Sequence, residues 1–322
     1  DLNAAEWMEA LRACKGMVLR QESYELDLDK LVGASRRQVP VRLYSVATHN
    51  CHIQRLQARG NNRHAVFLVT ESEAITYHHE LDLRGNDALE PDPRIAHTLN
   101  LRHDAFGNVQ QALSIAYPRR SGRTNAAAPQ QALIDSVQAE LHAAYAETRH
   151  TTDALQPERW QDRKLALRHH RLRQACEIRT YEIAGLRPPA SVYFDIDALR
   201  KLQLCEDQTL YPASGPERQQ QALGRLDYHQ QPPDDGLYRR LVEHVRTLYF
   251  DDALDTRPPS QPLTFGQLGP RGLKYEDYKL ALTDELLHAV FGRATASDPQ
   301  ADKLAWPIQG TATPRTLLAD SA

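Results

Sequence analysis

The chain has 322 residues, with 39 Lys and Arg against 42 Asp and Glu and a formal net charge of −3. This balance provides no bulk attraction to nucleic acid, and no apolar stretch approaches the ~18–20 residues of a membrane span. We therefore expect no nucleic-acid partner and no direct membrane insertion. At a prior of roughly 150 residues per domain, the length suggests about two structural units.

The first part of the chain combines a helical pattern with extended segments. Residues 4–14 have helical periodicity, and Gly16 provides a stop signal. Polar stretches at 59–62 and 71–73 predict turns between strands. The segments rich in β-branched and aromatic residues predict the strands themselves, at 18–26, 41–46, 51–56, 65–69 and 74–77.

Residues 97–117 carry the clearest local signal. Apolar residues alternate on both sides of a turn sequence that runs from Asp104 to Asn108. Asp104 can accept hydrogen bonds from the backbone that follows it, and Gly107 and Asn108 tolerate a positive φ. We predict an antiparallel hairpin with Asp104, Gly107 and Asn108 as its structural turn.

The second half continues with separated strands and few helices. Helical patterns are expected at 130–138, 195–202 and 283–291, and loops at 156–173 and 211–236. Residues 141–152 could extend the preceding helix, but their Tyr and Thr content favours a strand. Further strands are expected at 176–183, 241–249 and 278–282, and the pattern dissolves beyond residue 292. Without βαβ alternation, this order predicts a mainly β fold of antiparallel strands and hairpins with a few short helices.

The four cysteines, Cys14, Cys51, Cys176 and Cys205, are widely spaced and form no Cys-x-x-Cys pair. Neither structural zinc nor a disulfide framework is expected at this spacing, so we predict free and mostly buried thiols.

Four polar motifs raise the question of chemistry. His49–His52 contains zinc-ligand types, but successive strand residues face opposite sides of a sheet. Glu71–Glu73 has the Glu-x-Glu form of arginine-directed ADP-ribosyltransferases, although a turn explains the acids. His78–His79 could sense pH, and 159–173 is Arg-rich without the interleaved aromatics of a nucleic-acid platform. We predict no catalytic, cofactor-binding or metal-binding residue and no cofactor.

Several segments together resemble one family. The matching stretches begin with Gly-Met-Val-Leu-Arg-Gln-Glu-Ser-Tyr-Glu-Leu and include Asp-Ala-Phe-Gly-Asn-Val and Cys-Glu-Ile-Arg-Thr-Tyr-Glu-Ile-Ala-Gly-Leu. In order they are 16–26, 44–46, 53–59, 62–67, 73–79, 92–97, 104–109, 176–186, 245–249 and 278–282. The chain resembles the B component of insecticidal Tc toxin complexes, to which the plasmid virulence protein SpvB is related through its non-catalytic part.

The resemblance implies the wall of a hollow β-shell built of rearrangement-hotspot (RHS) repeats, which shields a toxic effector and helps to deliver it. The implied partners are the C component, which carries repeats and effector, the rest of the B component and, indirectly, the pore-forming A component. Residues 1–292 would form the wall segment and 293–322 a poorly ordered tail. The complex would act outside the producing cell after release from the cytoplasm, although no classical signal peptide opens the chain.

Two alternatives remain open at this point. One is an ADP-ribosylating virulence enzyme, and the other is a free-standing β-sheet binding module of a repeat protein. We interpret the chain as a piece of a longer polypeptide or a processed product. A wall segment cut from its neighbours should then leave unpaired edges near 18–26 and 241–249, which favours aggregation.

Overall fold

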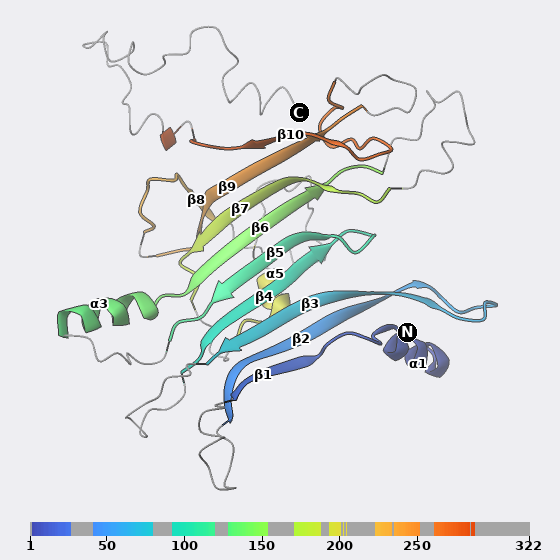
Figure 1. Cartoon of the computed structure of the whole chain (residues 1–322), viewed down its shortest axis with the longest axis horizontal. Helices are drawn as coiled ribbons and strands as arrows, with labels where there is room; N and C mark the ends of the chain where they lie inside the picture. Colours follow the sequence, from blue (N-terminus) through green and yellow to red (C-terminus); the bar gives the residue numbers. More distant parts are fainter. Residues whose placement is uncertain are drawn as a thin grey trace. The chain divides into compact units, whose positions relative to one another are not determined.

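A computed structural model shows a mainly β, antiparallel chain with a few short helices, which confirms the predicted fold class (Figure 1). It describes residues 2–26, 41–79, 92–119, 128–153, 171–187, 193–200, 202, 204, 223–233, 235–251, 261–283 and 285–286. Within these ranges, no helix has the length and apolar character needed to cross a membrane.

The chain divides into two compact units. The first unit comprises Asp1–Ala144 and Leu186–Leu202. In its sheet, β1 to β5 lie side by side in sequence order, and each pairs with the next in the antiparallel sense. Its elements are α1 (Ala4–Ala13), β1 (Arg20–Leu26), β2 (Val41–Gln57), β3 (Val66–His78), β4 (Arg94–His103), β5 (Val109–Ala116), α3 (Ala128–Gln138) and α5 (Ile196–Arg200).

The second unit comprises Tyr145–Gly185 and Gln203–Ala322. It contains most of β6 and four further strands. In it β9 pairs with β7 and β10 in the antiparallel sense and with β8 in the parallel sense. These strands are β6 (His142–His150), β7 (Ala175–Ala184), β8 (Gly224–Leu226), β9 (Tyr238–Tyr249) and β10 (Lys274–Lys279).

The long hairpin of β2 and β3 corrects the prediction of short strands separated by a turn at Glu71–Glu73. Both strands run without interruption, and Glu71–Glu73 lies inside β3. Asn50 is opposite Glu73 and Cys51 is opposite Glu71, so Ser72 is an extra residue that makes a β-bulge. The polar triplet thus reflects a bulge with solvent access rather than a chain reversal.

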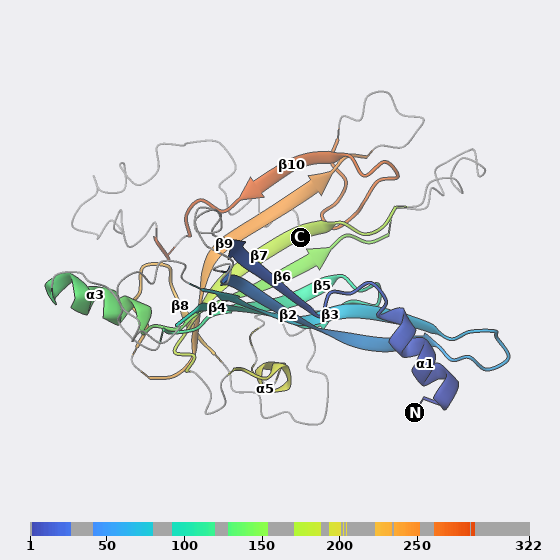
Figure 2. The ribbon, with the colours of Figure 1, turned by 60° about the horizontal axis from the view of Figure 1, so that its bottom comes forward.

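The core of the first unit follows the alternation of β4 and β5. Leu99 is opposite Leu113 and His97 is opposite Ile115, and all four side chains are buried on the same face. Helix α5 lies against this strand pair, where the Arg200 Nε atom donates to the Leu101 carbonyl oxygen over 3.0 Å (Figure 2). Burial of an alternating apolar row therefore fixes the register of the hairpin.

Other expectations differ in detail from the structure. The predicted loop at 211–236 contains the short strand β8, and β10 begins four residues before the predicted strand at 278–282. Since β9 has neighbours on both sides, the expectation of an unpaired edge at 241–249 is wrong, whereas β1 has only β2 beside it among the described strands. Most of the predicted helix at 283–291 and the whole of 293–322 lie outside the described residues.

Candidate functional site

The predicted turn residues form the connection between β4 and β5. The Asp104 carboxylate accepts hydrogen bonds from the backbone N–H groups of Phe106 and Asn108, over 2.8 and 2.9 Å. Its other oxygen accepts from the Asn108 side chain over 2.9 Å. Gly107 adopts a φ of 85° in this loop, a conformation that strains residues with a Cβ. The role of these three residues is structural, since they fix the reversal of the chain.

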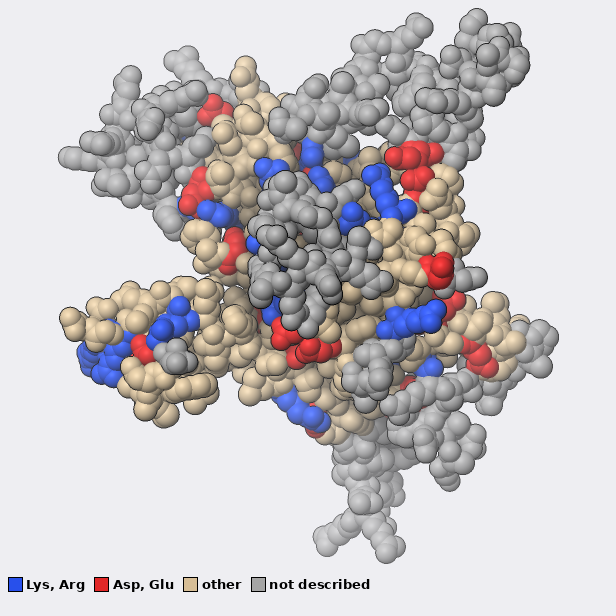
Figure 3. All heavy atoms as spheres, turned by 180° about the vertical axis from the view of Figure 1, so that it is seen from behind, with Lys and Arg blue, Asp and Glu red and all other residues tan. Residues whose placement is uncertain are grey.

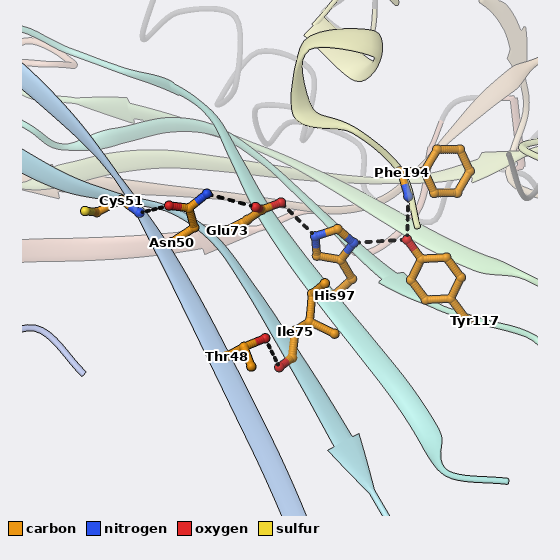
Figure 4. A network of polar contacts seen from close by, with 8 residues as sticks. All are labelled: Thr48, Asn50, Cys51, Glu73, Ile75, His97, Tyr117 and Phe194. Atoms are coloured by element: carbon orange, nitrogen blue, oxygen red, sulfur yellow. Dashed lines mark hydrogen bonds and ion pairs between the residues drawn. The ribbon is translucent and has the colours of Figure 1, made fainter. Parts of the chain in front are cut away.

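A polar network crosses the sheet of the first unit beside this hairpin (Figure 4). The ring of His97 lies between the Tyr117 hydroxyl, 3.0 Å from Nδ1, and the Glu73 carboxylate, 3.4 Å from Nε2. The backbone N–H of Phe194 donates to the Tyr117 hydroxyl over 2.9 Å, and Asn50 donates to Glu73 over 3.2 Å. The network thus fastens the segment before α5 to strands β2 to β5.

The protonation state of His97 follows from its partners. The tautomer that fits carries its proton on Nε2, which donates to Glu73, and accepts from the Tyr117 hydroxyl at Nδ1. Burial lowers the pKa of His97, and the Glu73 carboxylate opposes this effect only in part. Burial likewise raises the pKa of Tyr117, while the hydrogen bond from Phe194 acts against it. A neutral histidine held in this way connects elements and is poorly placed to exchange protons with solvent.

The two acids of the Glu-x-Glu motif have separate partners. Glu71 accepts a short 2.6 Å contact from His49 Nδ1 on the neighbouring strand, whereas Glu73 belongs to the His97 network. The bulge at Ser72 lies between them. Each carboxylate thus pairs with a histidine on a neighbouring strand, Glu71 on the β2 side and Glu73 on the β4 side.

Helix α1 lies beside the β2–β3 hairpin (Figure 2), and two of its carboxylates bind residues near the end of that hairpin. Buried Glu6 accepts from the Arg59 backbone N–H and from the Arg55 guanidinium, both over 2.9 Å. Glu9 accepts from the Ala65 backbone N–H over 2.8 Å. Backbone hydrogen bonds from Arg59 and from Asn3, the N-cap residue, hold the pKa of Glu6 below its usual range.

The second unit contains a buried ionic cluster on β7 and β9. The Glu177 carboxylate is 2.7 Å from both His244 Nε2 and Arg246 Nε, and 3.1 Å from an Arg179 guanidinium nitrogen. Burial alone would raise the pKa of Glu177, but hydrogen bonds from His244 and Arg246 and the nearby Arg charges hold it at about 2. Glu147 is buried on β6 and acts electrostatically on Arg179. The charges compensate one another within the cluster.

The structure covers the remaining motif residues only in part. Within the described part of the chain, no group of three or more His, Cys, Asp or Glu side chains could hold a metal ion. His78 is exposed on β3, and most of the Arg-rich stretch 159–173, with His169 and His170, lies outside the described residues. Cys176 is buried as expected, but Cys14 and Cys51 are half-buried, and their sulfurs lie 3.8 Å apart.

The charged surface is mixed in sign. On the face shown in Figure 3, the Lys and Arg side chains of the described residues are interspersed with Asp and Glu side chains. Many of these charges form ion pairs, such as Arg240 with Glu182 on neighbouring strands. This pattern agrees with the near balance of acids and bases in the sequence.

Sequence reasoning missed both the His97 network and the Glu177 cluster. A signal was present for each. His97 occupies the buried position in an alternating row with Leu99, and Glu177 alternates with Arg179 ahead of a buried tyrosine, Tyr181. A polar residue in register with a buried apolar row needs a partner, although the row does not reveal which distant residue supplies it.

Comparisons with known proteins agree with the resemblance seen in the sequence. Residues 9–164 match the model of the family described as the insecticide toxin TcdB middle/C-terminal region. A search of curated proteins finds no match. Among solved structures, the crystal structure of TcdB2-TccC3-Cdc42 aligns with a TM-score of 0.53 and 20% identity over 92% of this chain. The crystal structure of TcdB2-TccC3 without the hypervariable C-terminal region aligns with a TM-score of 0.53 and 19% identity, also over 92% of this chain.

The family-model match agrees with the predicted resemblance to the Tc toxin B component. At such identities the structural likeness concerns the fold, and the chain spans 11% of the length of either matched chain.

Proposed function

Because residues 9–164 match the model of the family described as the insecticide toxin TcdB middle/C-terminal region, we propose that the chain is a non-enzymatic wall segment of a toxin-enclosing shell. The family match is the observation that carries the proposal. Antiparallel sheets suit a wall, since the backbone groups of an interior strand pair with the strands on both sides and this pairing makes the sheet rigid.

The proposed role is passive shielding. A shell wall would separate an unfolded effector from proteases and from other exposed chains until it is delivered. By analogy with the TcdB2-TccC3 complexes, the direct partner would be a C component, together with the rest of the B component. The pore-forming A component would be an indirect partner, and the assembled complex would act outside the producing cell.

Co-expression with the missing B-component segments and a C component provides the test. We expect a soluble particle in which the effector resists a protease that digests the free effector. As the disruptive variant we choose Ile75→Pro, because Ile75 lies inside β3 between Thr48 and His97, and proline removes a ladder hydrogen bond. Ile75→Val is the matched control, since it keeps a β-branched apolar side chain.

The wall proposal predicts that Ile75→Pro exposes the effector to protease and that Ile75→Val does not. Equal protection in both variants, or an effector digested in the unsubstituted particle, would contradict it. A stable monomer of the chain alone that binds a separate ligand would favour the free-standing module instead.

A further inference from the structure

The end of α1 and the middle of β2 bring together two cysteines that are 37 positions apart in the sequence. Cys14 is the C-cap residue of α1, and its Sγ lies 3.8 Å from the Sγ of Cys51. Both side chains are half-buried and so retain some exposure to solvent. We propose that Cys14 and Cys51 form a disulfide when the protein meets a disulfide oxidant, and that this bond fastens α1 to the sheet of the first unit.

The geometry requires only a small movement. A disulfide places its sulfurs about 2.05 Å apart, so the two atoms have to approach by roughly 1.8 Å. Cys14 stands where the helix ends, ahead of a turn in which Gly16 has a φ of 95°. A residue at a helix end can adjust its side chain without breaking the helical hydrogen bonds that precede it. The Cys14 thiol also makes a weak 3.7 Å contact with the Ala10 carbonyl oxygen.

The docking of α1 presents the two sulfurs to each other. Glu6 and Glu9 already bind the hairpin formed by β2 and β3, through Arg59 and Ala65 respectively. The pair therefore does not depend on a chance encounter of mobile segments, and the disulfide would lock a contact that the reduced protein already makes.

The reaction is a thiol–disulfide exchange with an oxidised glutathione molecule. One cysteine thiolate attacks a glutathione sulfur, which forms a mixed disulfide and releases the first glutathione thiolate. The second cysteine thiolate then attacks the protein sulfur of the mixed disulfide and releases the second glutathione. Two electrons pass from the cysteine pair to glutathione disulfide, and the two thiol protons end on the two reduced glutathione molecules.

Burial slows the reaction of Cys51 with an oxidant and protects Cys176 from it. Burial and then the contact with Cys14 raise the pKa of Cys51, so its thiolate becomes abundant only in alkaline solution. Cys176 is 1% exposed, and burial raises its pKa to about 11, which protects it from the same oxidant. We therefore expect oxidation to begin at the Cys14–Cys51 pair and to accelerate as the pH rises.

The test is a peptide map of the full chain after incubation with oxidised or reduced glutathione under native conditions. We expect a peptide containing Cys14 joined to one containing Cys51, lost on reduction and absent in Cys14→Ser and in Cys51→Ser. Cys176→Ser is the matched control and should leave the cross-link intact. In oxidised protein the midpoint of chemical unfolding should shift to higher denaturant, and neither single variant of the pair should show this shift.

Three results would overturn the proposal. One is a folded, fully reduced pair after long exposure to oxidised glutathione in alkaline buffer. Another is a cross-link that forms only once denaturant is added. The third is pairing of Cys14 or Cys51 with Cys176 or Cys205 in yields equal to those of the Cys14–Cys51 link.

Discussion

Replacement of Glu177 by glutamine tests the buried ionic cluster of the second unit. The Glu177 side chain is only 5% exposed, and its carboxylate is bound by Arg179, His244 and Arg246. Its pKa is held at about 2, against an ordinary value of 4.5. A depression of this size corresponds to about 3 kcal/mol of stabilisation by the charged form, since each pKa unit is worth about 1.4 kcal/mol.

Glu177→Gln removes the negative charge and leaves the cationic groups of Arg179 and Arg246 buried beside each other. Loss of one partner of a buried ion pair typically costs about 3–5 kcal/mol, which agrees with the value worked from the pKa. We expect the free energy of unfolding, measured with a chemical denaturant near neutral pH, to fall by about 3 kcal/mol. The matched control is Glu243→Gln on the neighbouring strand β9, which also carries His244 and Arg246. Its exposed pair with Lys279 should contribute less than about 1 kcal/mol.

The stabilisation by the Glu177 charge depends on pH in a direction that can be tested. Because the folded pKa of Glu177 is depressed, its stabilisation is fully present above pH 4.5 and is lost as the pH falls toward 2. The difference between the wild type and Glu177→Gln should therefore shrink over that window. A variant as stable as the wild type at neutral pH, or a difference that does not change on acidification, would contradict a stabilising role for the Glu177 charge.

Three further predictions follow from the first unit. Gly107→Val should lower the free energy of unfolding by about 1–2 kcal/mol, since φ is 85° and a Cβ would lie 3.3 Å from a Thr70 methyl group; an unchanged denaturation midpoint would contradict this. The free energy of unfolding of the wild type should decline as the pH falls below 6.5, because His97 takes up a proton in the unfolded chain more readily than in its buried folded position. In His97→Gln, the free energy of unfolding measured by chemical denaturation should depend less steeply on pH in this range. Incubation with NAD should label no arginine-bearing acceptor, and labelling that Glu73→Gln abolished would instead support the ADP-ribosylating alternative.

Local interactions in this chain could be predicted from the sequence, whereas contacts between distant residues could not. The hairpin at 97–117 was predictable because its alternation and its turn chemistry are both local. The interior of β3 was not, because Glu71 and Glu73 lie on a strand whose bulge depends on its pairing with β2. The contact of Glu177 with His244 joins residues 67 positions apart, and no local pattern specifies such a pairing. The fold class was therefore accessible from the sequence, whereas the polar partners required the topology.

The carboxylates of Glu6 and Asp104 have both oxygens engaged in hydrogen bonds within the chain. A catalytic carboxylate needs an oxygen that faces the reacting group. Glu6 instead accepts from Arg59 at one oxygen and from Arg55 and Asn3 at the other, and Asp104 likewise engages both oxygens. Each of these acids ties a loop or a helix to a strand end, where backbone N–H groups would otherwise lack a partner. These acids therefore mark where α1 and the β4–β5 turn are fastened to the sheet, a property that the proposed wall role requires.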